Sequence, residues 1–524
     1  MTRKPTRPNR GRNMVAKSYT IPASTKGWLA NETISRMEET GAVVLDNFFP
    51  DPDAIRWRRG SQIFATTPET TPVETMMVWQ GGSVNNIFAC VGNKIYDVTA
   101  GGTISSASVT GLSSNRWQSV NFSTPGGQFL VAVNGLDAPR NFNGTTWSTS
   151  PAITGPANPN LLIHVWPFKQ RLFFVEFGTA NVWYLAPNAI GGAAIQLPLG
   201  SLLTKGGYIM AGATWTRDSG YGPQDYCVFI SSEGEVLVYA GTDPSQTATW
   251  SKVGQFTIGR PIGRRCWLNV GSDLIINCSD GLMPLSKAIQ YDRAAAAEAA
   301  FTWNIQKAFN AAYASYGTNF GWQILSYPKT NMAIINIPVA SGLTSYQYVM
   351  NVLTGAWARF IGMNASSWIV RQDDIFFGDM QGRVLQAETG SADINQPISA
   401  VWVSAFNDLG RPGLQKNIRL ARPIFITDPG VNAAVGVCSD YNVLTPTAVQ
   451  SAVSLNSSLW DQALWDQGQW APDNTTLSNW VNVSGEGYQL AGAVAINMLS
   501  STPTVAINCK LASMTILYEP GGYI

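Results

Sequence analysis

The chain of 524 residues contains one histidine, His164, and this limits the catalytic and metal chemistry that the sequence supports. His164 lies in the apolar run LLIHVWPF, and the sequence has no nucleophile elbow to pair with it. A serine–histidine–aspartate triad would have to use this one side chain, and zinc sites with two or three histidines are excluded. We therefore expect His164 to lie in the core or at the edge of a strand, outside any catalytic site.

The cysteines and the glycine-rich turns do not point to a cofactor either. None of the cysteines is in CxxC spacing, and each lies in an apolar, strand-like run: Cys90, Cys227, Cys266, Cys278, Cys438 and Cys509. We expect six reduced, buried thiols in preference to a disulfide framework, in a chain made in a reducing cytosol. The sequence has no GxxxxGK[ST] motif and no GxGxxG that opens a helix after a strand, so we expect no cofactor and no metal.

Carboxylates are the remaining candidates for catalysis, because a glycosidase needs two acids that flank a sugar bond. The run from Thr216 through Asp218 resembles the start of the Asp-box turn of sialidases, but it occurs once and lacks the closing tryptophan. Asp373 and Asp374 are adjacent, so on a strand their side chains would point to opposite faces, and a solvated turn is the simpler interpretation. We expect no enzyme, with a glycosidase or depolymerase acting on host-surface sugar as the alternative.

Tryptophans recur at five-residue spacing near the C-terminus, at Trp460, Trp465 and Trp470. They could form a platform for sugar, which would make the chain a carbohydrate-binding module. The spacing fits neither one face of a helix nor one face of a strand, so a loop-rich packing motif is the preferred interpretation.

The N-terminal arm is strongly basic. Residues 1–17 hold six of the 34 basic side chains and none of the 33 acidic ones: Arg3, Lys4, Arg7, Arg10, Arg12 and Lys17. The arm is a candidate contact for nucleic acid or for an acidic protein face, with a solvated tail as the alternative. No apolar h-region follows it and no apolar stretch reaches the length of a bilayer span, so we expect neither a signal peptide nor a membrane span.

Strand–turn–strand units recur along the body of the chain. In residues 128–147, QFLVAVNGLDAPRNFNGTTW, the first apolar run could be buried on both faces, and Asn134-Gly135 and Asn143-Gly144 suit type I′ turns. Similar units recur at intervals of roughly 50 residues, which is typical of the four-stranded blades of a propeller. We predict a mainly β protein with a β-propeller of six or seven blades over residues 42–390, and a series of β-sandwich units is the alternative.

Two other regions differ from this pattern. Residues 286–314 are rich in alanine and carry an apolar stripe at helical spacing, which predicts a helical insertion in the propeller. The composition changes after Gly390, and residues 391–524 are predicted to form a C-terminal β-sandwich or barrel-like domain. Residues 1–41 are predicted to be the basic arm and its lead-in.

Several stretches, in their order along the chain, resemble the tail nozzle proteins, or packaged-DNA stabilization proteins, of short-tailed bacteriophages (podovirus type, P22-like). The stretches that carry the resemblance are DNFFP at 46–50, RWRRG at 56–60, GNKIYD at 92–97, VNGLDAPRNFNG at 133–144, DGLMPLS at 280–286, MAIINIP at 332–338, residues 349–360 and the tryptophan repeat after Trp460. No single stretch is a strong motif, and the order of the whole set carries the resemblance.

The resemblance implies a propeller protein of the phage virion, synthesised in the host cytoplasm and assembled as a homo-oligomeric ring, a hexamer, in the tail. Such a ring lies below the head-to-tail adaptor, extends the DNA exit channel, helps retain packaged DNA, and anchors tail fibres or spikes. Genomic DNA would pass without sequence-specific contact, and no catalytic activity is implied. Charged residues make up only 13% of the chain and tryptophan is frequent, with 19 residues, which agrees with large protein interfaces. The basic arm is a departure from the family pattern.

Overall fold

The computed structural model describes residues 16–82, 84–218, 222–340, 342–428, 430–453, 475–500 and 503–523. The chain is mainly β, with 52% of residues in strands and 8% in helices. It divides into two compact units. Unit 1 combines the described residues up to Trp57 with those of 399–501 and those from Ile507 onward, and unit 2 comprises 58–398 and the short segment 502–506.

Among the described residues, unit 2 contains seven sets of three or more paired strands, here called sheets, and they follow one another along the chain. The strands pair antiparallel except for one short parallel edge strand. The first three sheets comprise β7 (Thr75–Gly81), β8 (Val84–Val91) and β9 (Lys94–Asp97); β11 (Gln118–Thr124), β12 (Gly127–Val133), β13 (Arg140–Phe142) and β14 (Trp147–Ser148); and β16 (Leu162–Phe168), β17 (Arg171–Glu176), β18 (Asn181–Tyr184) and β20 (Ile195–Pro198). The next three comprise β21 (Ile209–Asp218), β22 (Pro223–Ser231), β23 (Glu235–Gly241) and β24 (Trp250–Thr257); β25 (Trp267–Val270), β26 (Asp273–Cys278) and β27 (Gly281–Pro284); and β28 (Gln323–Tyr327), β29 (Met332–Ala340), β30 (Thr344–Asn351) and β31 (Trp357–Phe360). A separate two-stranded pair joins β15 (Ile153–Thr154) to β19 (Gly192–Ala193).

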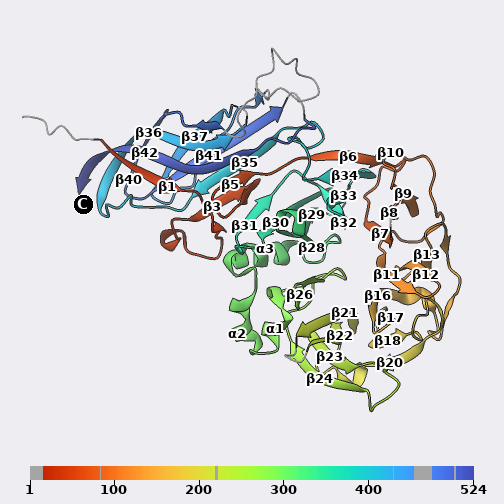
Figure 1. Cartoon of the computed structure of the whole chain (residues 1–524). Helices are drawn as coiled ribbons and strands as arrows, with labels where there is room; N and C mark the ends of the chain where they lie inside the picture. The colour runs from red at the N-terminus through yellow and green to blue at the C-terminus, as the bar shows by residue number, and fades with distance from the viewer. Residues whose placement is uncertain are drawn as a thin grey trace, which may run out of the picture. The chain divides into compact units, whose positions relative to one another are not determined.

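The last sheet joins the two ends of unit 2. It contains β32 (Ala365–Arg371), β33 (Asp374–Asp379) and β34 (Arg383–Ala387) together with β6 (Ser61–Thr66), the first strand of the unit, and β10 (Gly102–Thr103) at its edge. β6 pairs antiparallel with β34, with Ala65 opposite Val384. Figure 1 shows the sheets of unit 2 arranged in a ring around a common axis. Successive antiparallel sheets closed by the strand from the other end of the chain form a β-propeller, as predicted.

The apolar runs of the strands are buried on both faces because each sheet packs between its two neighbours. In β17, Phe173 and Val175 pack toward the following sheet, whereas Leu172 and Phe174 pack toward the preceding one. The same alternation occurs in β12, as the sequence indicated. Strands that face hydrophobic neighbours on both sides read as continuous apolar runs, which explains the low charge of this part of the chain.

The predicted helical insertion at 286–314 is present as several short helices instead of one continuous helix. They are α1 (Leu285–Ala288), α2 (Arg293–Ala296) and α3 (Gln306–Tyr316), with the 3₁₀ turns η4 (Ala297–Ala299) and η5 (Trp303–Ile305) between the last two. The break follows from tertiary hydrogen bonds at Phe301, whose N–H donates to Leu282 O at 2.9 Å and whose carbonyl accepts from Trp357 Nε1 at 2.9 Å. The predicted apolar stripe comprised Ala297, Phe301, Ile305, Phe309 and Ala312. In the structure Ile305, Phe309 and Ala312 are buried, whereas Phe301 is exposed, so the stripe does not form one continuous buried face.

Unit 1 is built from both ends of the chain. One of its sheets has the order β39 (Thr475–Leu477), β36 (Leu414–Thr427), β42 (Cys509–Tyr523), β5 (Ile55–Trp57) and β4 (Phe48–Pro50), with β1 (Lys17–Pro22) on β42 and β40 (Val481–Gly487) on β36. Its other strands are β2 (Gly27–Trp28), β3 (Gly41–Asp46), β35 (Ile398–Ser404), β41 (Leu490–Ser500), β37 (Ala433–Ser439) and β38 (Ser451–Val453). Gly492 of β41 lies so close to Met514 of β42 that a Cβ there would be 2.7 Å from its sulfur, so these strands face each other.

This division differs from the predicted boundaries at residues 42 and 391. β3 pairs with β35, with Ala42 opposite Ser404, and β1 pairs with β42, with Lys17 opposite Tyr518. The predicted lead-in therefore includes ordered strands of unit 1, and residues 391–398 belong to unit 2. These pairings join residues several hundred positions apart, which local sequence patterns do not report. In the described part of the chain, no helix is both long and apolar enough for a bilayer span.

Candidate functional site

A cavity of about 790 Å³ lies in unit 2 where the loops of six of its sheets meet, and we call it the axial cavity. Its walls include the segment before β11 (113–116), the turn after β12 (134–136), the loop before β25 (263–265) and the loop between α3 and β28 (317–322). Phe177, which follows β17, and Glu74, which precedes β7, also line the cavity. Because six successive sheets contribute to its walls, the cavity lies at the centre of their ring.

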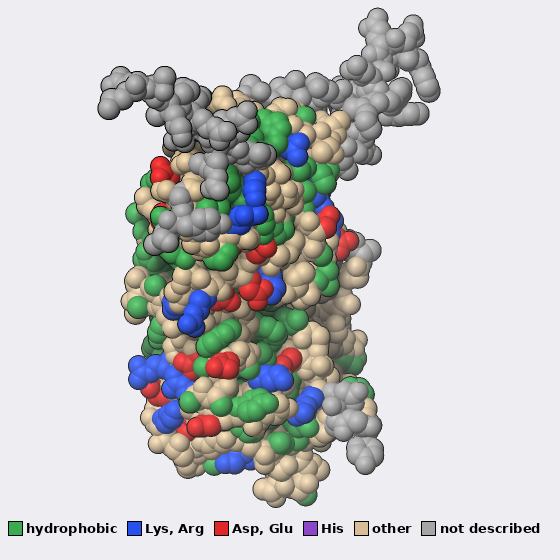
Figure 2. Space-filling model, turned by 90° about the vertical axis from the view of Figure 1, so that its left-hand side faces the viewer, with side chains coloured by type: hydrophobic (Ala, Val, Ile, Leu, Met, Phe, Trp, Pro, Cys, Tyr) green, Lys and Arg blue, Asp and Glu red, His purple; other side chains and the backbone are tan. Residues whose placement is uncertain are grey.

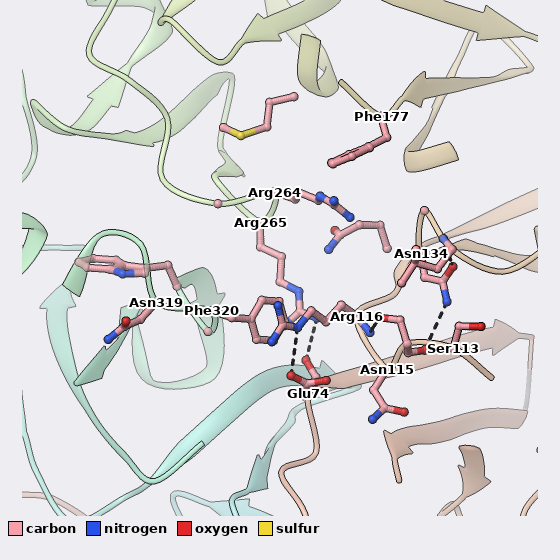
Figure 3. A pocket seen from close by; sticks show the side chains of 18 of the residues that line it. Glu74, Ser113, Asn115, Arg116, Asn134, Phe177, Arg264, Arg265, Asn319 and Phe320 are labelled. Carbon is pink, nitrogen blue, oxygen red and sulfur yellow. Dashed lines mark hydrogen bonds and ion pairs between the residues drawn. The ribbon is translucent and has the colours of Figure 1, made fainter. Parts of the chain in front are cut away.

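The described residues that line the axial cavity include three arginines and a single carboxylate. Arg116 Nε lies 3.0 Å from Glu74 Oε1, and Arg265 donates to the Glu74 carbonyl at 2.9 Å. The guanidinium groups of both arginines pack against the Phe320 ring, at 4.1 Å and 5.4 Å from its centroid respectively. These contacts hold the two cations in place, and Figure 3 shows them together beside Glu74.

Arg264 differs from its two neighbours because its guanidinium has no hydrogen bond or ion pair in the described part of the chain. Its contact is the Phe177 ring, whose centroid lies 5.8 Å from the guanidinium carbon. Figure 3 shows the Arg264 side chain on the Phe177 side of the cavity, away from Glu74. Burial lowers the pKa of Arg264 and lowers that of Arg265 to about 10, so both groups remain charged at neutral pH.

The Asn134-Gly135 turn forms part of the cavity wall, and its geometry differs from the predicted type I′ turn. Gly135 has a φ of 84°, but Asn134 is not among the residues with positive φ, which a type I′ turn requires at both centres. Asn134 Oδ1 instead accepts from the N–H groups of Leu136 and Asp137, at 2.9 and 2.7 Å, and forms an Asx turn. Asn143 does the same for Thr145 and Thr146.

His164 is a core residue, as expected from its apolar surroundings. It is 4% exposed, and its Nε2 donates to the carbonyl of Gly212 in the next sheet at 2.9 Å. Burial lowers the pKa of His164 to about 4, and the Arg264 cation acts in the same direction. The imidazole is therefore neutral in the folded protein at pH 7.

The lowered pKa of His164 predicts a loss of stability in mild acid. The ordinary histidine pKa is about 6.5, so between that value and about 4 the unfolded chain binds a proton that the folded chain does not. The stability is fully present above pH 6.5 and falls as the pH decreases, by about 2 kcal/mol between pH 7 and pH 5. Urea unfolding of the wild type and of His164→Gln at both pH values would measure this. An equal pH dependence in the two proteins would contradict the assignment, since the chain has no other histidine.

The other predicted site residues do not form a site in the described part of the chain. Asp373 and Asp374 lie at the β32–β33 turn, where Asp374 is 3.6 Å from Lys329 Nζ and the Asp373 carbonyl accepts from Tyr327. Lys17 begins β1 in unit 1. The remaining arm residues (Arg3, Lys4, Arg7, Arg10 and Arg12), the Asp218 side chain and the tryptophan repeat at 460–470 lie outside the described residues.

The cysteines are buried and free, and the possible metal ligands are dispersed in the part of the chain that the structure describes. All six cysteines are free and buried, as predicted. Within the described ranges, no three side chains of His, Cys, Asp or Glu are grouped closely enough to hold a metal ion.

The axial cavity itself was not predicted from the sequence. Its arginines and phenylalanines come from loops that are far apart in the chain, and none belongs to a spaced motif. The one available signal was the Arg264-Arg265 pair, which resembles the Arg58-Arg59 pair near the start of unit 2. A pair of adjacent arginines does not by itself indicate a cavity.

Comparison with known proteins identifies no family for the chain. No protein-family model matches it, and no curated protein does. Similar solved structures include BBS1N in complex with ARL6DN (10% identity over 65% of this chain and 99% of that chain, TM-score 0.40) and the β-propeller domain of Myceliophteria thermophila Cps50 (Swd1) (11% identity over 63% and 99%, TM-score 0.37). Saccharomyces cerevisiae Sqt1 is also similar, with 10% identity over 66% of this chain and 86% of that chain and a TM-score of 0.32. These scores are too low to carry an argument, and the class of fold rests on the strand order described above.

Proposed function

We propose that this protein is a structural subunit of a bacteriophage tail nozzle. In this proposal it assembles into a hexameric ring below the head-to-tail adaptor, extends the DNA exit channel, helps retain packaged DNA and anchors tail fibres or spikes. The observation that carries the proposal is the ordered set of stretches that resembles that family, in a chain whose body is a β-propeller as the resemblance implies. The proposed role is not enzymatic.

The positions of those stretches support the proposal because they fall on turns and strand starts that shape the propeller. Residues 92–97 form the β8–β9 turn and strand β9, 133–144 include β13, and 280–286 include β27. We further propose that the seven sheets of unit 2 are seven blades and that unit 1 is a β-sandwich formed by both ends of the chain.

Exposed apolar side chains also support a role in assembly. Leu343 and Leu353 of unit 2 are each 69% exposed, and Val449 of unit 1 is 79% exposed. On the face in Figure 2, hydrophobic side chains lie among Lys, Arg, Asp and Glu, and no large region carries charge of one sign. The exposed leucines and Val449 are available for contact with other protein chains.

Ring assembly is the prediction that tests this function most directly. We expect native mass spectrometry and electron microscopy of the full chain to show a hexameric ring, alone or after mixing with purified adaptor rings. Because an obligate interface should persist on dilution, the ring fraction should change little over the concentrations that both methods allow. A monomer that also fails to bind adaptor rings would refute the proposal, and shortening of host polysaccharide by the purified protein would favour the glycosidase alternative.

A further inference from the structure

We propose that the axial cavity of unit 2 binds an acidic segment of a partner protein, with Arg264 as the principal contact for a carboxylate. The proposed site does not depend on ring assembly or on phage function. It rests on the charge, the apolar lining and the size of the cavity.

The described lining of the cavity carries more positive than negative charge. The described lining residues include three guanidinium groups but only one carboxylate, that of Glu74, which Arg116 already engages. Arg264 is partly buried, and burial lowers the pKa of its guanidinium, yet this group forms no ion pair in the described part of the chain and packs on the Phe177 ring. A partly desolvated cation without an anion is unfavourable, and an incoming carboxylate would remove that cost.

The apolar part of the cavity favours a peptide over a phosphate. Phe177 is 53% exposed and Leu136 is 58% exposed, and both line the same cavity as Arg264. Its volume of about 790 Å³ lies within the range of about 300–1,000 Å³ that is usual for ligand sites. A short peptide with an apolar side chain next to its acidic residues fits such a lining, whereas inorganic phosphate would leave most of it empty.

The site is preorganised. Arg116 and Arg265 are held against Phe320, and Arg265 donates to Thr75 Oγ1 at 2.6 Å as well as to the Glu74 carbonyl. These two cations therefore need little reordering when a ligand enters. The guanidinium of Arg264 supplies the N–H donors for the carboxylate. Bidentate contact with a carboxylate is the geometry that arginine favours.

The test uses the full chain and a fluorescein-labelled hexapeptide that contains two adjacent aspartates and one leucine, followed by fluorescence anisotropy. We expect binding that Arg264→Gln weakens by about tenfold or more, because a charge-assisted hydrogen bond is lost. The matched control is Arg217→Gln, since Arg217 also lies over an aromatic ring, that of Trp215, but does not line the cavity. That control should bind the peptide as the wild type does.

Four outcomes would overturn the proposal. These are equal binding of the matched asparagine peptide, an unchanged affinity in Arg264→Gln, absence of peptide binding up to about 1 mM, and competition by inorganic phosphate or a single-stranded oligonucleotide as strong as that by unlabelled peptide. Should Arg264→Gln fail to fold, Arg264→Lys takes its place. Lysine keeps the positive charge but lacks the paired N–H donors of the guanidinium, so this variant should show an intermediate loss of affinity for the peptide.

Discussion

Replacing Arg58 with alanine is expected to lower the free energy of unfolding of unit 2 by about 3–5 kcal/mol, because it leaves a buried carboxylate without its cation. The Arg58 side chain is 1% exposed and forms a two-pronged ion pair with Asp393, whose side chain is 13% exposed. Arg58 also donates to the carbonyl of Ile361 at 2.9 Å, and Ser61 donates to Asp393 at 3.0 Å. These bonds tie the first residues of unit 2 to the segment after its last sheet. Urea unfolding followed by tryptophan fluorescence would measure the change.

Two control variants separate the buried pair from a general effect of charge removal. The double variant Arg58→Met/Asp393→Leu should recover most of the loss, because replacing both partners leaves no buried charge unpaired. Lys329→Ala removes the cation of an exposed pair, in which both side chains are about half exposed, and it should change stability by no more than about 0.5 kcal/mol. Equal losses of stability in Arg58→Ala and Lys329→Ala would show that the closure of the propeller in unit 2 does not depend on the Arg58–Asp393 ion pair.

Replacing Trp166 with alanine is expected to cost about 3–5 kcal/mol through the cavity that it would leave between two sheets of unit 2. Trp166 is 1% exposed, stacks on Phe173 with ring centroids 5.4 Å apart, and meets Phe229 of the next sheet edge-on at 5.9 Å. Gly212 lies beneath it, and a Cβ at that position would be 2.3 Å from the ring, so the ring packs directly on the backbone of the next sheet. The same urea titration measures the loss.

Trp303 provides the matched control for this substitution because it is 40% exposed, in the short turn η5. Trp303→Ala removes the same side chain from a site that solvent already reaches, so its effect should be no more than about 1 kcal/mol. A loss of similar size at both positions would mean that packing between neighbouring sheets is not what Trp166 contributes.

Short-range features of this protein were predictable where neighbouring residues decide the conformation. The apolar run at 128–133 predicted a strand buried on both faces, and the structure confirms it in β12. The isolated histidine and the six buried thiols also followed from their apolar neighbours. The two Asn-Gly turns lie where the sequence predicted turns, but the predicted type I′ was wrong. The asparagine side chains accept backbone N–H groups, and this stabilises Asx turns in which the asparagines do not adopt a left-handed conformation.

The sequence alone determined that the chain is mainly β and repeats a strand–turn–strand unit, because the alternation of apolar residues and the turn residues act over a few positions. Only the tertiary structure decided which strands close the propeller, which chain segments form unit 1, and where the helical region breaks. It also brought Arg116, Arg264 and Phe177 from three separate loops into one cavity. Contacts of that kind depend on how successive sheets are placed around an axis, and no local pattern of residues encodes which loops will meet there.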